Sequence, residues 1–216
     1  NTTKGKVNVK NSGGKIVAET KNGDITVSKY DGEISLLTAT GKVSIENSKG
    51  TLAAETSDGD LSMNACEGQI SGKTIAGKQT YDKIGGNLSI KGSSGAVKVS
   101  DCELESITSS TKAATINFFK VKSVFHIETE RGQIISASSA NGVTLTGSSD
   151  FTTTEGKINL TLLNKKDELS FDLEHSQKGD IALIAKGERT TKKQLVVGKG
   201  AILVTGRSVI GSQMYK

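Results

Sequence analysis

The strongest constraint on the fold is a glycine at every ninth position through the first hundred residues. In most units the residues two and four positions after the glycine are apolar, and those between them are polar or small. This alternation is typical of a short strand with one buried face. Eleven of the 25 glycines form the series: Gly5, Gly14, Gly23, Gly32, Gly41, Gly50, Gly59, Gly68, Gly77, Gly86 and Gly95.

A second series shows that nine residues are half of the structural repeat. Threonine recurs every eighteen residues, three positions before alternate glycines, at Thr2, Thr20, Thr38, Thr56 and Thr74. Two strands and two turns per eighteen residues describe one coil of a flattened parallel β-solenoid, whose coils stack about 4.8 Å apart. The sequence therefore predicts an all-β parallel solenoid of about twelve coils, in which a turn at the next glycine ends each strand.

We interpret residues 1–216 as a single solenoid domain with three sections. Residues 1–99 are regular, residues 100–155 form less regular coils, and residues 156–216 form longer terminal coils with a cap. In the middle section, Phe125 and Val143 keep the eighteen-residue spacing, as do Ile127 and Leu145. All five phenylalanines follow residue 117, which favours a wider core in the second half.

One regular coil departs from the pattern of inward positions. Gln79 and Tyr81 occupy the two inward positions after Gly77, and the preceding strand offers Gly72 as an inward residue. We expect the Tyr81 ring to fill the space that Gly72 leaves on the facing sheet.

Two outward columns and one edge are distinctive features of the predicted surface. An alternating charge ladder follows alternate glycines, and it would pair opposite charges in successive coils. On the other sheet, a stripe of mostly small residues would let another backbone approach closely, and it is the first candidate interaction face. The second candidate is the uncapped edge of the first coil, which is compatible with edge-to-edge self-association. The ladder is Lys6, Asp24, Lys42, Asp60 and Lys78, and the stripe is Val17, Ser35, Ala53, Ser71 and Ser89.

Composition limits the compartment and the partners. The 28 basic and 23 acidic residues are interspersed, so we expect a mixed-charge surface and no nucleic-acid partner. No stretch has the length of a membrane span. Cys66 and Cys102 lie two coils apart, beyond disulfide reach, so we expect free thiols. The chain begins at Asn1 inside a repeat unit, so we expect a processed or missing upstream segment.

Several chemistries fit the sequence poorly. The aspartates follow no nine-residue rule that would place calcium ligands in the turns. His126 and His175 lack neighbouring ligands with zinc spacing, and we interpret both as surface or loop residues. A chain without tryptophan offers few platforms for a sugar cleft, and the outward threonines do not form an ice-binding array. We therefore expect no catalytic residues, no metal and no cofactor.

The repeat units resemble those of the adhesin-like, or toast-rack, family. The segments that carry the resemblance are Thr20–Val27, Thr56–Met63 and Ser176–Leu183, each of which has the form T-x-x-G-D-I-x-V or close to it. The resemblance implies a right-handed β-solenoid and covers most of the chain. It also implies a setting in bacterial envelope proteins or in mitochondrial eukaryotic relatives, and it supplies no catalytic residues.

These observations lead to three functional hypotheses. The first is a non-catalytic structural or binding module that acts through protein–protein contacts, as an accessory subunit of a larger complex, such as a mitochondrial membrane complex. The alternatives are an exported bacterial cell-surface adhesin and a carbohydrate-active β-helix enzyme. The basic isoelectric point and the unpaired cysteines favour the mitochondrion over the bacterial envelope.

Overall fold

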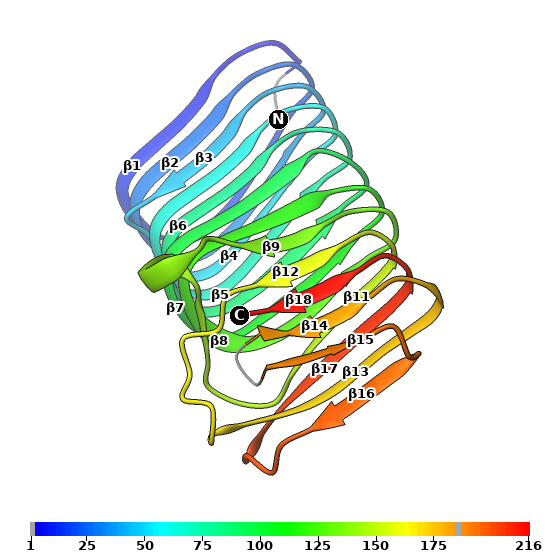
Figure 1. Cartoon of the computed structure of the whole chain (residues 1–216). Helices are drawn as coiled ribbons and strands as arrows, with labels where there is room; N and C mark the ends of the chain where they lie inside the picture. Colours follow the sequence, from blue (N-terminus) through cyan, green and yellow to red (C-terminus); the bar gives the residue numbers. More distant parts are fainter. Residues whose placement is uncertain (1–2, 185–186) are drawn as a thin grey trace.

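The computed structural model describes residues 3–184 and 187–216, and strands make up most of them (Figure 1). Their order is β1 Val7–Thr20, β2 Ile25–Thr38, β3 Val43–Glu46, β4 Lys49–Thr56, β5 Leu61–Thr74, β6 Gln79–Gly92, β7 Ala96–Thr111, β8 Thr115–Thr129, β9 Ile134–Ser136, β10 Val143–Leu145, β11 Ser149–Glu155, β12 Ile158–Leu160, β13 Leu169–Lys178, β14 Ile181–Leu183, β15 Glu188–Thr190, β16 Gln194–Val197, β17 Ile202–Ile210 and β18 Gln213–Tyr215. A short 3-10 turn, η1, spans Ser139–Asn141.

The first coils stack in parallel with the predicted eighteen-residue register. Val7 lies opposite Ile25, Ile25 opposite Val43, and Val43 opposite Leu61. The predicted parallel β-solenoid is thus confirmed, and its coils are visible as a ladder in Figure 1. The predicted number of coils is wrong, because the stack has about eight turns of this length. Later coils are longer, and two strands near the C-terminus pair antiparallel to their neighbours.

The T-x-x-G corners at Thr38, Thr56 and Thr74 are organised by the threonine of the eighteen-residue series. The Thr38 hydroxyl donates to the carbonyl of Gly23 at 3.2 Å and accepts the N–H of Gly41 at 3.1 Å. Thr56 makes the equivalent pair of bonds one coil later. The buried hydroxyl therefore satisfies two backbone groups at the corner and joins successive turns. This dual role explains why threonine recurs with alternate glycines only.

The other corner is a bend within a continuous strand. In β2, Lys29 has φ 54° and Gly32 has φ 141°, and the residues between them turn the chain while pairing to the next coil continues. A residue in the left-handed region bends the chain through an angle that extended residues do not reach. Our expectation that a turn ends every strand is therefore wrong at this corner, where strands such as β2 and β5 run through with 14 residues.

The coil that departs from the pattern has the predicted packing. Tyr81 is fully buried, and a Cβ added at Gly72 would overlap its hydroxyl, which confirms the size complementarity. The Tyr81 hydroxyl donates to the Gln79 side-chain oxygen at 2.6 Å, and the Gln79 amide donates to the Lys91 carbonyl at 2.8 Å. The Tyr81 ring therefore fills the space beside Gly72, and its hydroxyl has a hydrogen-bond partner.

The same arrangement recurs near the end of the chain, where sequence reasoning missed it. Tyr215 is fully buried and donates to Gln213 at 3.2 Å, while a Cβ at Gly206 would overlap the Tyr215 hydroxyl. In both places the glycine lies seven residues before the glutamine and nine before the tyrosine. This shared G-x6-Q-x-Y spacing was the available signal.

The middle coils are longer than predicted. Ile127 pairs with Phe151, not with Leu145, and Val143 pairs with Val121, not with Phe125. The separation across β8 and β11 is 24 residues, because the chain between β9 and β11 adds η1 and a second short loop. The wider core is present here: Phe118, Phe125 and Phe151 are buried, with ring centroids 5.2 and 5.7 Å apart.

The last two strands are inserted into the stack out of sequence order. β17 pairs in parallel with β11 on one side and with β13 on the other, and β18 lies likewise between β12 and β14. Figure 1 shows the red strands β17 and β18 between earlier ones. The corner glycines follow the same order, since Gly179 lies against Gly211 and Gly211 against Gly156.

Strands β15 and β16 run antiparallel to the other strands and cover the end of the stack opposite β1. They pair antiparallel with β14 and β13, respectively. The chain then passes from β16 to β17 across the start of β13, where Gly198 and Gly200 lie against the backbone of Glu168 and Leu169. The Gly-Lys-Gly segment fits here because a side chain at either glycine would overlap that backbone.

Candidate interaction surfaces

The predicted stripe forms one straight outward column on the second half of each long strand. The register places Val17, Ser35, Ala53, Ser71 and Ser89 opposite one another in successive coils. Val17 is 67% exposed, and the others are exposed or half-buried. A shallow open groove of about 300 Å³ runs over Ala53, Ser71 and Ser89. The groove exists because longer side chains, such as Gln69 and Asn87, stand in the adjacent column.

Beyond Ser89 the same column continues with larger polar side chains. Ser89 pairs with Thr108, Thr108 with His126, and His126 with Asp150. His126 is exposed as predicted, and its Nδ1 lies 2.5 Å from a carboxylate oxygen of Asp150. The flat small-residue surface therefore extends over the first half of the solenoid and meets a charged surface in the second.

The predicted charge ladder makes contacts of two kinds. Lys6 lies 3.6 Å from the Asp24 carboxylate, which also accepts the backbone N–H of Lys42 at 3.0 Å. Asp60 accepts the backbone N–H of Lys78 at 2.9 Å. Among the described ladder residues, only Lys6 and Asp24 form an ion pair, and both aspartates contact the next coil through its backbone. Shorter ion pairs occur in other columns: Lys15–Glu33, Lys49–Glu67, Lys73–Glu55 and Lys122–Glu103, at 2.8, 2.6, 2.6 and 2.6 Å.

The edge of the first coil is the second candidate surface. β1 pairs with β2 along its length, and among the described residues no strand pairs with its outer edge. Val7, Val9 and Ile16 are only partly buried there, whereas their counterparts in β2 are almost fully buried.

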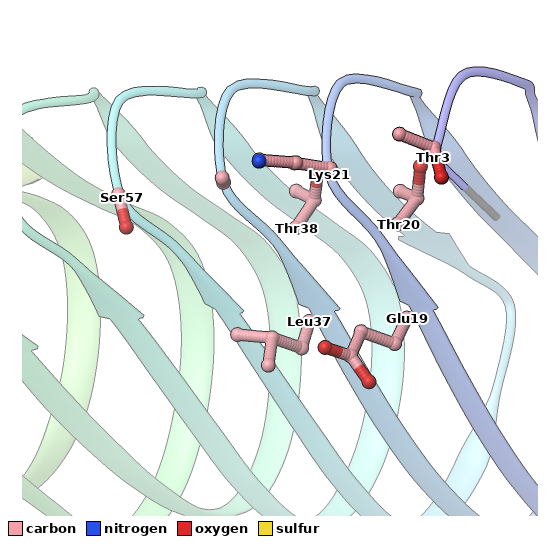
Figure 2. A pocket seen from close by; sticks show the side chains of 8 residues that line it. Thr3, Glu19, Thr20, Lys21, Leu37, Thr38 and Ser57 are labelled. Carbon is pink, nitrogen blue, oxygen red and sulfur yellow. The ribbon is translucent and has the colours of Figure 1, made fainter. Parts of the chain in front are cut away.

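A corner groove of about 570 Å³ adjoins this edge (Figure 2). It is lined by Thr3, Lys21 and Ala39 along the turn and by Glu19 and Leu37 on neighbouring strands. Figure 2 shows Glu19 and Leu37 side by side below the turns. Thr20 also lines the groove, and its hydroxyl is buried without a hydrogen-bond partner, unlike those of Thr38 and Thr56 in the next two coils.

One histidine prediction is wrong. His175 is 4% exposed, and neither ring nitrogen has a hydrogen-bond partner. A register shift between His175 and Lys178 adds a residue at this corner, so His175 lies opposite Ser208 in the threonine column and Ser176 is exposed. The resemblance of Ser176–Gly179 to the other T-x-x-G units did not reveal this bulge. Within residues 3–184 and 187–216 no group of three or more His, Cys, Asp or Glu side chains could hold a metal ion.

Both cysteines are buried free thiols, as predicted. Cys102 accepts the N–H of Ile84 at 3.3 Å, and its thiol lies 3.0 Å from the Ser100 carbonyl. Burial raises the pKa of the Cys66 thiol and raises the pKa of the Cys102 thiol to about 11. The thiolate is the reactive form of cysteine, so both groups are protected by burial and by protonation.

We expect neither thiol to react with DTNB at pH 8 in the folded protein, and both to react in urea. Because the folded pKa of Cys102 is raised, its contribution to stability is complete below the unfolded thiol pKa. It is lost as the pH rises toward about 11. Thiol titration with and without urea checks the first expectation, and urea unfolding across this alkaline range checks the second. Cys102→Ala should lessen the pH dependence, and fast native labelling of Cys102 would contradict the burial.

Comparison with known proteins places this solenoid in a family. The family model described as Toastrack DUF4097 matches residues 46–201, more than two thirds of the chain. The chain belongs to the Toastrack DUF4097 family. No curated protein and no solved structure shows significant similarity to it. The Toastrack match leaves out β1, β2, β17 and β18, so the first-coil edge and the inserted strands are interpreted from this chain's own residues.

Proposed function

We propose that this Toastrack domain is a non-catalytic structural module that binds other proteins and serves as an accessory subunit of a larger assembly. The observation that carries the proposal is the Val17–Ser89 stripe and the groove along it. Small side chains flanked by longer ones form a straight recess on a rigid parallel sheet, into which a partner's side chains or backbone can fit.

The size and rigidity of the surface support this role. At the sheet spacing the five stripe residues span roughly 19 Å, comparable to one dimension of a standard protein interface. A solenoid presents such a surface without rearrangement, because each coil is held by its neighbours. The exposed Val17 side chain adds an apolar contact at one end of the stripe.

The fold and the family suggest no reaction. The Toastrack DUF4097 description names no activity. No helix among the described residues is long and apolar enough to cross a membrane. The proposal places the assembly at a mitochondrial membrane, with this domain bound to other subunits there.

The test compares the native mass of the protein from its source with that of two lysine variants. Ser35→Lys with Ser71→Lys places long charged side chains in the stripe and should release the protein from its complex. Ser44→Lys with Thr80→Lys is the matched control, because these residues have the same two-coil spacing on the other outward face. Recovery of the wild-type protein as a free monomer, or equal behaviour of both variants, would overturn the proposal. A monomer would direct attention to a surface ligand of an adhesin.

A further inference from the structure

We propose that an apolar groove over β7, β8 and β9 binds a short segment of another protein that carries a carboxylate beside a large apolar side chain. The groove lies on the outward face away from the stripe and shares no residue with it. The inference rests on the proposed protein-binding function. It deepens that function by naming a second contact surface and the chemistry of the segment that fits there.

This outward face changes from polar to apolar at β8 and β9. Phe119 occupies in β8 a position before the bend that is polar in five successive earlier coils, and in the neighbouring column Ile135 follows Asn117. Four of the five phenylalanines are buried in the core, whereas Phe119 is half-buried and faces outward. A cluster of apolar side chains at outward positions is typical of a binding surface. The five polar residues are Ser28, Glu46, Asn64, Asp82 and Ser100.

The apolar side chains line a shallow groove of about 420 Å³. Ala96 and Ala137 also line it, and the groove is hollow where these short side chains lie beside the longer ones of Phe119 and Ile135. Lys120 lies over the Phe119 ring, with its Nζ 5.5 Å from the ring centroid. The groove thus has room for a large apolar side chain of a partner, with an aromatic ring among the residues that would contact it.

Two lysines at the β6 end of the groove have no acidic partner. Lys78 is the last member of the charge ladder, because Ala96 stands eighteen residues later, where the alternation would place an aspartate. Lys98 lies in a column that is uncharged in the earlier coils, from Asn8 to Thr80. Both lysines are exposed, and neither forms an ion pair with a described residue. A carboxylate of the partner would therefore complement these two charges beside the apolar groove.

The other charges on this face favour a protein segment over a membrane surface. Asp60 and Asp82 lie on the same face in the preceding coils, and the Asp82 carboxylate accepts hydrogen bonds from Asn64 and Ser100 at 2.8 and 2.7 Å. These carboxylates would repel the headgroups of an anionic bilayer that covered the face. A short segment can instead contact the groove and its two lysines and leave the aspartates in water.

Parallel selections from a phage-displayed library of random short peptides would identify what the groove accepts. One selection uses the full chain as bait, and the other uses the full chain with Lys98→Gln and Phe119→Ser. We expect the peptides enriched only on the wild type to carry Asp or Glu within a few positions of a large apolar residue. Fluorescence anisotropy would then show that the affinity of such a peptide falls with added salt, because the lysines are exposed to solvent.

Protein variants locate the contact. Lys98→Gln with Phe119→Ser should weaken binding of an enriched peptide by roughly tenfold or more, because it removes an aromatic contact and a charge together. The matched control, Lys42→Gln with Leu37→Ser, makes the same kinds of change at an exposed lysine and an exposed leucine outside the groove, and it should leave the affinity unchanged. Lys98→Gln alone alters only an exposed side chain, so it should leave the fold intact and weaken binding by roughly threefold.

Several outcomes would overturn the proposal: no enriched peptide distinguishes the two baits, those that do lack acidic residues, or the site and control variants bind equally well. Cosedimentation of the wild type with phosphatidylserine vesicles, lost in the Lys98 and Phe119 variant, would overturn it in favour of a membrane surface. A wild-type dimer that this variant dissociates would overturn it in favour of a second copy. The stripe variants test the proposed function separately, because loss of the native complex in Ser35→Lys with Ser71→Lys would support that function even if the groove bound no peptide.

Discussion

Replacing Gly59 with alanine is expected to lower the free energy of unfolding by about 3 kcal/mol or more. The new Cβ would overlap the carbonyl oxygen of Gly41 and lie 2.7 Å from the hydroxyl of Thr56. Backbone atoms on both sides are held by parallel pairing, so the corner can relax only by separating the coils. Urea unfolding followed by circular dichroism would measure the loss.

Substitutions at two further glycines distinguish the cost of steric overlap from the cost of a strained backbone conformation. A Cβ at Gly14 would meet nothing within 4 Å, but its φ is +98°, so Gly14→Ala should cost about 1–2 kcal/mol from strain alone. At Gly85 the nearest atoms lie at 3.7 and 3.9 Å with no unusual φ, so Gly85→Ala should change stability by about 0.5 kcal/mol or less. If Gly59→Ala and Gly85→Ala lowered the free energy of unfolding equally, the close contact between Gly59 and the Gly41 carbonyl would be contradicted.

Local periodicity predicted the regular part of the fold because each coil repeats the same contacts. The glycine and threonine spacings were sufficient to place Val7 opposite Ile25 and the stripe in one column. The Gly72 and Tyr81 pair could also be predicted, because both lie in coils with known inward positions. In this region a residue's environment follows from its place in the repeat.

Prediction failed where the chain departs from the repeat without a sequence signal. The extra residues around η1 shift the pairing of Ile127 to Phe151, and the bulge after His175 moves that side chain inward. The insertion of β17 between β11 and β13 depends on pairings far apart in sequence, which periodicity does not contain. Our count of twelve coils assumed that every later strand continues the stack in order.

The candidate surfaces could likewise be predicted only in part. The outward stripe could be predicted by position alone, but the groove along it depends on how far the side chains of the neighbouring columns extend from the sheet. The lysines of the first coil were visible in the sequence, and we considered only Lys6 as part of the ladder. The structure adds that Lys15 forms an ion pair with Glu33 of the next coil at 2.8 Å.

Deleting residues 199–216 is expected to detach the β13–β16 segment while β1–β8 remains folded. β17 contributes the parallel ladders to both β11 and β13, and its Arg207 binds Asp172 at 3.0 Å and Glu174 at 3.4 Å, both on β13. Hydrogen bonds from Gln194 and Arg207 also hold the pKa of Asp172 below its usual range. Without β17 and β18, Asp172 and Glu174 lose Arg207, and the segment loses the parallel ladders that join it to the stack.

Limited proteolysis with mass spectrometry would show the result as rapid cleavage between residues 163 and 198 and protection of the earlier coils. Deletion of residues 1–21 is the matched control, because it removes a terminal coil and leaves an equivalent edge at β2. In a stack held by nearest neighbours, that control should lower stability without exposing the C-terminal segment. If the shortened chain protects residues 163–198 as well as the full chain does, β13 must pack directly on β11, and the inserted strands do not hold the end of the solenoid together.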